Sequence, residues 1–151
     1  MVIPQNYQRS RHVPSSFIVS IQRFLILYTA WKGVLDSGIY FASMDVNNNW
    51  SPPTTIPGAS TDASPSLAVF NDRLYVAFKG LWIDSVIYFV SMDRNNRWTA
   101  STRFLPGRTL RGPALVSFNA CLYNVYSGNP TVRYLTNICY SYYPYAGNRG
   151  F

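Results

Sequence analysis

Two stretches of the chain decide its fold class: Tyr40-Phe41-Ala42-Ser43-Met44-Asp45-Val46-Asn47-Asn48-Asn49-Trp50 and Tyr88-Phe89-Val90-Ser91-Met92-Asp93-Arg94-Asn95-Asn96-Arg97-Trp98. Eight of their eleven positions are identical, at an offset of 48 residues. Upstream of them, residues 27–33 match residues 74–80, and residues 122–128 begin a third copy. Self-similarity at a fixed period of this size indicates an array of structural repeats.

Each repeat is predicted to form four short strands. In the second copy we expect strands over residues 66–70, 73–78, 85–91 and 98–104, with Asn71-Asp72 as a tight turn between the first two. Apolar and polar residues alternate along these segments with the period of two that strands require. An all-β repeat of about 48 residues with four strands is typical of a β-propeller blade.

The repeats predict one domain made of three blades. Residues 14–58 form the first, 59–107 the second and 108–151 an incomplete third, whose missing strand we expect residues 1–13 to supply. Known propellers have about 4–8 blades, so three cannot close a ring. We therefore expect a two-fold homodimer with six blades; the alternative is that the chain is part of a longer propeller.

Composition supports the all-β prediction and shows an uneven charge. The 151 residues include no glutamate, and the net charge is +7. Residues 1–75 carry five basic and four acidic side chains (+1), and residues 76–151 carry eight and two (+6). Five arginines lie within 18 residues, which suits either an anionic ligand or a solvated face: Arg94, Arg97, Arg103, Arg108 and Arg111. Nucleic acid is the less favoured partner because no nucleic-acid-binding motif is present.

The two cysteines predict neither a disulfide framework nor a metal site, and we expect no cofactor. Cys121 and Cys139 fall on strands expected to be neighbours, which leaves a bridge open, with free buried thiols favoured. The sequence shows no signal peptide and no run of about 18 apolar residues that would span a membrane. These features predict a soluble protein that is cytoplasmic or secreted by a non-classical route.

The two quoted stretches resemble the Asp-box of sialidases and other propellers, S-x-D-x-G-x-x-W, with asparagine at the glycine position. The resemblance implies a structural hairpin between the third and fourth strands of a blade, and not a catalytic motif. We expect Asp45 and Asp93 to accept backbone hydrogen bonds within the turn. Asn47 and Asn95, at the glycine position, are expected to adopt the left-handed conformation. We expect Trp50 and Trp98 to fill the seam to the next sheet.

The whole repeat resembles the blades of bacterial and fungal β-propeller lectins, in which an aromatic residue, a basic residue and glycine precede an aspartate and an aromatic strand. This resemblance implies multivalent glycan binding. The candidate ligand-binding residues are Trp31, Lys32, Asp36, Tyr40, Phe78, Lys79, Asp84 and Tyr88. The alternative is that the aromatics form inter-blade core and that each lysine pairs with its aspartate. The third copy lacks the basic residue and the aspartate, so we expect any site there to be weaker.

An enzyme is not expected. Sialidases use an arginine triad and a tyrosine nucleophile activated by glutamate, and this chain has no glutamate. Its six acids are aspartates. Two lie in the Asp-box hairpins and Asp72 lies in a turn, so paired-carboxylate hydrolysis would need two of Asp36, Asp62 and Asp84 to converge, which we do not expect. His12 is the sole histidine, which leaves no catalytic triad or zinc site. The sequence therefore predicts a lectin, with a non-enzymatic protein- or nucleic-acid-binding scaffold as the alternative.

Overall fold

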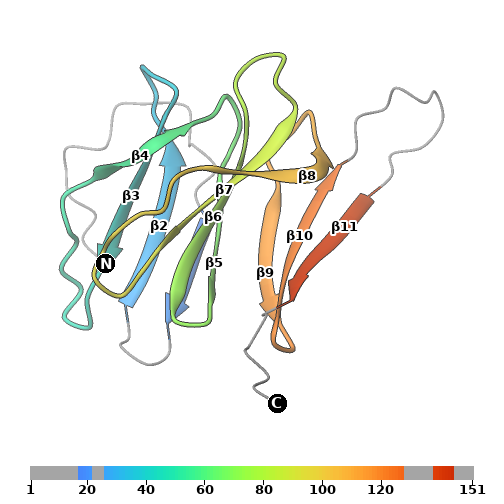
Figure 1. Cartoon of the computed structure of the whole chain (residues 1–151). Helices are drawn as coiled ribbons and strands as arrows, with labels where there is room; N and C mark the ends of the chain where they lie inside the picture. The colour runs from blue at the N-terminus through green and yellow to red at the C-terminus, as the bar shows by residue number, and fades with distance from the viewer. Residues whose placement is uncertain (1–16, 22–25, 128–137, 145–151) are drawn as a thin grey trace.

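The chain folds into three antiparallel sheets (Figure 1) in a computed structural model that describes residues 17–21, 26–127 and 138–144, with side chains over 26–104 and 108–127. The first sheet contains β1 (Phe17–Ile21), β2 (Ile26–Lys32), β3 (Gly38–Met44) and β4 (Thr54–Ser60). The second contains β5 (Ser66–Phe70), β6 (Arg73–Lys79), β7 (Val86–Met92) and β8 (Thr102–Arg108). The third contains β9 (Ala114–Phe118), β10 (Cys121–Ser127) and β11 (Ile138–Pro144). No helix occurs in these ranges, which confirms the all-β prediction.

Each sheet is an up-and-down meander in which neighbours in sequence are neighbours in space. The turn between β5 and β6 is Asn71-Asp72, with φ of 47° and 58°, and the β9–β10 turn is Asn119-Ala120, with φ of 48° and 56°. Two positive φ values are the requirement of a type I′ turn, whose twist matches that of the flanking strands. The predicted Asn71-Asp72 turn is confirmed.

The fourth strand of the second sheet differs from its prediction. It runs from Thr102 to Arg108 instead of over residues 98–104, and Trp98 makes only a single bridge to Met92. Between them, the Thr99 hydroxyl accepts a hydrogen bond of 3.0 Å from Ser91 N, which holds this stretch in the hairpin. The expected end of this strand at Leu105-Pro106-Gly107 is wrong: Pro106 has no N–H to donate, but β8 is the last strand of its sheet, where no further strand requires that donor.

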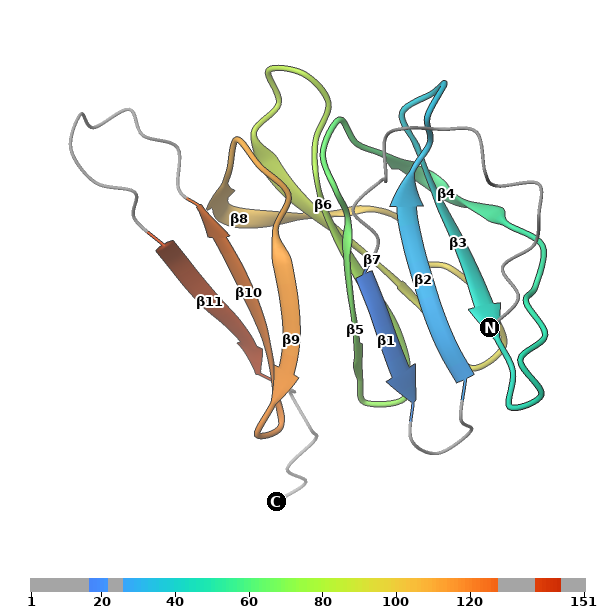
Figure 2. The same ribbon diagram turned by 180° about the vertical axis from the view of Figure 1, so that it is seen from behind.

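The first strands of the three sheets, β1, β5 and β9, lie side by side, with β5 between the other two (Figures 1 and 2). The Ser66 hydroxyl accepts a hydrogen bond of 2.9 Å from Leu115 N, which joins β5 to β9. Gly112 lets the next connection approach closely, because a Cβ there would overlap the carbonyl of Ser64. The second sheet is therefore covered by a sheet on each face.

Apolar side chains fill both seams between the sheets. Leu74, Val76 and Phe78 of β6 belong to the core shared with Ile39 and Ile56 of the first sheet. A smaller cluster joins the second sheet to the third, and it consists of Ala68, Phe70, Tyr75, Leu115 and Leu122. The alternating direction of side chains along β5 and β6 explains why both seams receive apolar residues.

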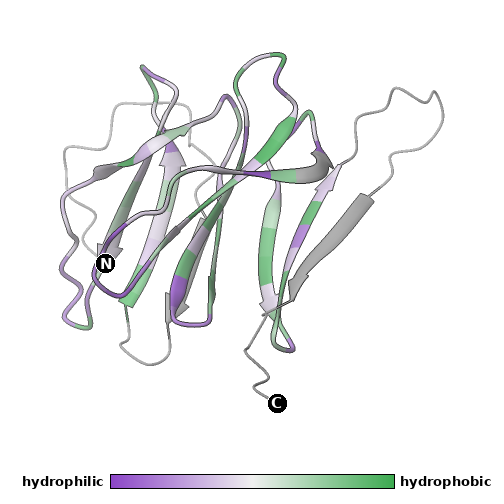
Figure 3. Ribbon diagram, viewed as in Figure 1, coloured by the Kyte–Doolittle hydropathy of each residue, from purple (hydrophilic) through white to green (hydrophobic). Residues whose placement is uncertain are grey.

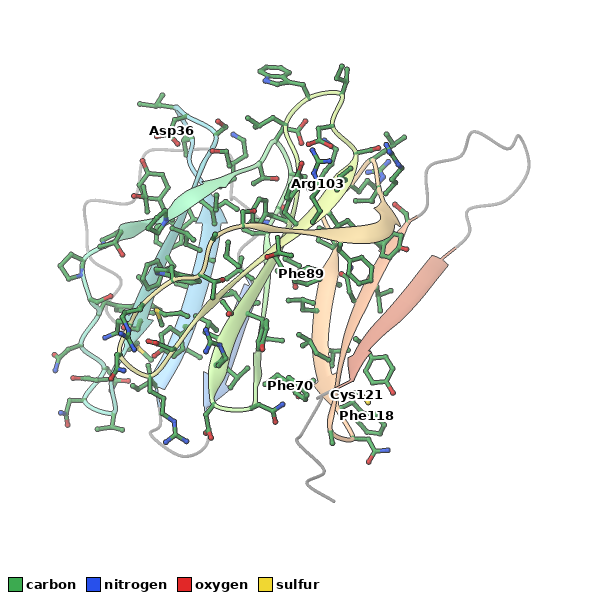
Figure 4. The ribbon with its side chains drawn as sticks, in the orientation of Figure 1. Asp36, Phe70, Phe89, Arg103, Phe118 and Cys121 are labelled. Carbon is green, nitrogen blue, oxygen red and sulfur yellow. The ribbon has the colours of Figure 1, made fainter. Side chains whose placement is uncertain are left out.

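The outer faces of the first and third sheets face no described sheet. Val116 and Phe118 of β9 are 50% and 69% exposed, and Phe118 projects from the lower end of its strand in Figure 4. Trp98 packs edge-on against Phe41 of the first sheet, with ring centroids 5.0 Å apart. Trp50 occupies the matching position of the first sheet and is 41% exposed. The seam role predicted for the tryptophans is thus seen at Trp98, toward the preceding sheet.

The cysteines cannot form a bridge, although their strands are neighbours as predicted. Cys121 lies opposite Pro144 in the β10–β11 register, and Cys139 lies opposite Tyr126. Five ladder positions of about 3.4 Å separate them, far beyond the reach of a disulfide. Cys121 is free and only partly buried, so the expected buried thiol is wrong for this residue. The predicted N-terminal strand over residues 1–13, with His12, lies outside the described residues.

Candidate functional site

The loops of the three sheets gather at two opposite edges, which we name from their position in Figure 1. The upper edge carries residues 33–37, 61–65, 80–85 and 109–113. The lower edge carries the hairpins at residues 45–53, 71–72, 93–101 and 119–120. All eight candidate ligand-binding residues lie at the upper edge or on the strand ends beside it.

In the β2–β3 loop, Asp36 holds the chain in a fixed turn. Its Oδ1 accepts a hydrogen bond of 3.0 Å from Gly38 N, and its Oδ2 accepts one of 2.8 Å from the Tyr40 hydroxyl. That hydrogen bond, the negative charge of Asp36 and desolvation raise the pKa of Tyr40. A Cβ on Gly33 would overlap the Asp36 carboxylate, so glycine leaves the space in which this carboxylate lies.

Lys32 and Trp31 complete the first loop. Lys32 Nζ donates to the carbonyls of Gly33 at 2.9 Å and Asp36 at 3.3 Å. The Trp31 and Tyr40 rings lie opposite each other on β2 and β3 and stack at a centroid distance of 6.2 Å and an interplanar angle of 18°. The structure therefore brings together all four residues predicted for the first copy, and Asp36 marks their place in Figure 4.

The β6–β7 loop repeats this arrangement in the second sheet. Asp84 accepts hydrogen bonds from Val86 N at 3.0 Å and the Tyr88 hydroxyl at 2.8 Å, and Phe78 stacks on Tyr88 at 5.8 Å. Desolvation opposes ionisation of Asp84, but these hydrogen bonds and the charges of Arg103 and Lys79 outweigh it, so the pKa of Asp84 is lowered. Arg103 lies over the Tyr88 ring at 5.9 Å, near this loop (Figure 4).

Lys79 is a structural cation and not an open ligand contact. It is 3% exposed, and its Nζ donates to Asp62 Oδ1 at 2.7 Å, to Gly80 O at 2.9 Å and to Trp82 O at 3.1 Å. These three acceptors use all three of its N–H groups. Phe78 is also buried, in the core that the second sheet shares with the first. In the second copy the residues are brought together, but two of the four are covered.

The alternative of a lysine paired with its own aspartate is wrong in both copies. The Asp36 and Asp84 carboxylates bind the tyrosine hydroxyls, while the Lys79 ion pair is with Asp62, from the connection between the first two sheets. The shared sequence pattern of aromatic, lysine, glycine, aspartate and tyrosine therefore accounts for two rigid loops. The first copy, with Trp31, Lys32 and Tyr40 each partly exposed, remains accessible.

The lower-edge hairpins follow the expected aspartate chemistry with one correction. Asp45 Oδ1 accepts hydrogen bonds from the amides of Asn47 and Asn49, and Asp93 Oδ1 accepts the same pair from Asn95 and Arg97, at 2.8 and 2.9 Å in each hairpin. Hydrogen bonds from residues 49 and 97 lead the causes that lower the pKa of both aspartates. The left-handed residues are Asn48 and Asn96, one position later than predicted, with φ of 64° and 59°.

The arginines that cluster in the sequence separate in space. Arg94 and Arg97 lie in the lower hairpin and form ion pairs with Asp72 and Asp93. Arg108 and Arg111 lie at the upper edge, because β8 carries the chain from one edge to the other, and Arg103 lies on β8 beside Tyr88. The predicted Arg-rich face is therefore divided between two edges, which weakens the nucleic-acid alternative.

A cleft of about 280 Å³ opens at the lower edge between the first two sheets. Ile26, Tyr28, Leu74 and Met92 give it an apolar wall, and burial raises the pKa of the Tyr28 phenol. The polar lining consists of Asp72, Asp93, Arg94 and Asn96. A small apolar hollow with a few convergent polar groups is the usual form of a site for one small ligand.

Sequence reasoning missed this cleft. Its walls come from two sheets, and their approach follows from stacking, which local sequence patterns do not encode. One signal was available: Arg94 replaces Val46 between two otherwise similar hairpins, and its ion-pair partner Asp72 belongs to the turn between β5 and β6. Arg97 breaks the repeat in the same way by replacing Asn49, so the sequence alone does not single out Arg94.

The cleft also brings together two carboxylates, those of Asp72 in the β5–β6 turn and Asp93 in the Asp-box hairpin. A glycosidase acid needs a raised pKa in order to donate a proton near neutral pH. The pKa of Asp93 is lowered, and both of its oxygens accept hydrogen bonds within the hairpin. The pair does not have the arrangement of a general acid and its partner.

No protein family and no curated protein matches this sequence. Within the described ranges, no group of three or more histidine, cysteine or acidic residues is placed to hold a metal ion. The same part of the chain contains no helix with the length and apolar character to cross a membrane.

Proposed function

We propose that this protein is a non-enzymatic carbohydrate-binding protein whose glycan site is the cleft between the first and second sheets. The observation that carries the proposal is the combination in one hollow of an apolar wall and an exposed Arg94–Asp72 ion pair. A volume of about 280 Å³ suits a single ligand ring rather than an extended polymer.

The cleft has an apolar wall and a polar lining, which correspond to the apolar face and the hydroxyl groups of a sugar ring. A pyranose has an apolar face of C–H groups, which can lie against the partly exposed Ile26 at the mouth of the apolar wall, and a rim of hydroxyls. Asp72 supplies hydrogen-bond acceptors for this rim, and Arg94 supplies donors in a planar fork. Their side chains are 47% and 57% exposed, so a ligand reaches them without first breaking a buried pair.

The proposal includes the assembly that makes binding multivalent. Three antiparallel sheets whose first strands lie side by side, together with the resemblance to propeller lectins, support a six-bladed ring made from two copies. In this ring the open face of the third sheet lies against the open face of the first sheet of the other copy. Two-fold symmetry repeats the contact, so the interface is closed and each ring presents two clefts. Two weak sites on one particle gain affinity by avidity.

A glycan array, followed by calorimetry with the best ligand, tests the site. Arg94→Gln is expected to weaken binding at least tenfold, because a charge-assisted hydrogen bond contributes roughly 1.5–3 kcal/mol. Arg97→Gln is the matched control, since it makes the same charge change in the same hairpin without lining the cleft. Equal affinity of both variants and the unmodified protein would reject the cleft as the site.

A third variant separates this site from the upper edge. Trp31→Ala removes the accessible stacked ring of the first copy, where the lectin resemblance places the ligand. The cleft proposal predicts that this variant keeps its glycan affinity. Loss of binding in Trp31→Ala with retention in Arg94→Gln would move the site to the upper edge. Absence of binding to every glycan would contradict the proposed function itself.

A further inference from the structure

The upper edge exposes large apolar side chains at the tips of its loops. Leu35 is 100% exposed in the β2–β3 loop, beside the exposed Val34. In the β6–β7 loop, Trp82 is 81% exposed and Ile83 is fully exposed. Leu110, in the β8–β9 connection at the same edge, is 56% exposed. Figure 3 shows hydrophobic colour in the β6–β7 loop at this edge.

These tips are held in place and are not loose segments that happen to be apolar. In the β6–β7 loop, Asp84 N donates to Leu81 O at 2.8 Å, and the buried Lys79 ammonium binds the Trp82 carbonyl. Trp82 has a φ of +52°, a conformation that is unfavourable for a bulky residue. At this position glycine would adopt the positive φ with less strain than tryptophan, and serine would expose less apolar surface. Backbone strain and apolar exposure at one residue are a combination typical of functional contacts.

The charge around the tips is positive. The upper edge and the strand ends beside it carry Lys32, Lys79, Arg103, Arg108 and Arg111 against Asp36, Asp62 and Asp84, which is five cations and three anions, or +2. Among the described residues, the lower edge carries equal numbers of positive and negative side chains, with Arg73, Arg94 and Arg97 against Asp45, Asp72 and Asp93. Arg108 and Arg111 are exposed on either side of Leu110. Within the described ranges, the edge that carries Leu35, Trp82 and Ile83 is thus also the more cationic one.

We infer that the upper edge is a docking surface for an anionic lipid membrane, and this inference is independent of the glycan cleft at the opposite edge. Apolar loop tips enter the interfacial region, where a tryptophan ring is well accommodated, and arginines bind lipid phosphates. Each basic residue near an anionic surface adds to the attraction, which salt weakens. A lipid surface is favoured over a single protein partner because the tips lie on three separate connections along one edge.

Vesicle co-sedimentation tests the inference with the unmodified full chain. We expect binding to vesicles of phosphatidylcholine with phosphatidylserine, at least tenfold weaker binding to phosphatidylcholine alone, and a fall in binding with added salt. Trp82→Ser with Ile83→Ser is expected to weaken binding at least tenfold. Val46→Ser is the matched apolar control, because Val46 is 59% exposed at the lower edge, and it is expected to leave binding unchanged.

A charge-matched pair of variants tests the arginines. Arg108→Gln with Arg111→Gln should weaken vesicle binding, whereas Arg94→Gln with Arg97→Gln, which removes the same charge at the lower edge, should leave it unchanged. Vesicles with brominated acyl chains should quench tryptophan fluorescence, and Trp82→Phe should remove most of this quenching. Melting temperatures of all variants show whether each remains folded.

Three results would overturn the inference. The first is a lack of binding of the unmodified protein to anionic vesicles at low salt. The second is full binding by the folded Trp82→Ser, Ile83→Ser variant. The third is salt-dependent binding to a single-stranded oligonucleotide that exceeds vesicle binding and depends on Arg108 and Arg111, which would assign these cations to nucleic acid.

Discussion

Gly33 and Gly80 determine whether the two upper loops can form. A Cβ on Gly33 would overlap the carboxylate of Asp36, and a Cβ on Gly80 would overlap that of Asp84. Each of these carboxylates accepts a hydrogen bond from a tyrosine hydroxyl. Gly80→Ala is expected to displace Asp84 from Val86 N and Tyr88, and to lower the free energy of unfolding by about 1–3 kcal/mol. Urea denaturation measures this change. An unchanged midpoint would show that the carboxylate does not hold the loop.

Ala120 has a side chain that is unfavourable in its backbone conformation. It occupies the second position of the β9–β10 turn with a φ of 56°. Ala120→Gly is expected to raise the free energy of unfolding by about 1 kcal/mol, because glycine adopts this conformation without a steric penalty. Ala114→Gly, in strand β9, is the control and should destabilise. A lower melting temperature for Ala120→Gly would contradict the turn geometry.

At the scale of elements, the hairpins make folding stability depend on pH. The pKa values of Asp45 and Asp93 are lowered in the folded protein, so the charged forms favour folding. Their contribution is complete above the unfolded-state pKa of about 3.9 and is lost as pH falls through the lower folded pKa. The melting temperature should therefore fall below about pH 4. The double variant Asp45→Asn, Asp93→Asn should be less stable at pH 7, and its melting temperature should fall less on acidification than that of the unmodified protein. An equal fall in melting temperature would show that other groups cause the acid response.

The Lys79–Asp62 pair joins the second sheet to the connection that precedes it. The third repeat has Ser127 and Leu110 at the matching positions, so neither half of the pair occurs there. Asp62→Leu is expected to destabilise by about 1–3 kcal/mol, because it leaves the Lys79 charge buried without its carboxylate, which is itself partly exposed.

A double-mutant cycle measures this coupling. Lys79→Ser combined with Asp62→Leu recreates the third-repeat pair and should destabilise less than the sum of the two single changes. Strict additivity would show that the ion pair does not couple the two elements.

Local chemistry explains which elements could be predicted from sequence. The strands and the Asn71-Asp72 turn follow from alternation and turn residues, which act over a few positions. The start of β8 was misplaced, because Trp98 is a strand-forming residue that tertiary packing on Phe41 keeps in the hairpin. The Lys79–Asp62 ion pair and the Arg94–Asp72 cleft could not be predicted, because both depend on contacts between sheets or connections that are distant in sequence.

At the scale of the whole molecule, the outer faces of the first and third sheets are the surfaces at which we propose that two copies meet. Val116 and Phe118 expose an apolar surface on the third sheet, in a chain whose other two seams are filled with similar residues. Val116→Asp with Phe118→Asp is expected to prevent the proposed ring contact while the first two sheets remain folded. Light scattering after gel filtration should then give a monomer, and circular dichroism should retain its β-sheet signal. Dimers of this variant would place the interface elsewhere.

The mass of the unmodified protein in solution tests the six-bladed ring most directly. Sedimentation equilibrium over a wide concentration range is expected to give twice 17.2 kDa, because two copies cover both open faces and leave none for a third. A mass of 17.2 kDa at every concentration, or one that grows without limit, would contradict the closed two-fold assembly.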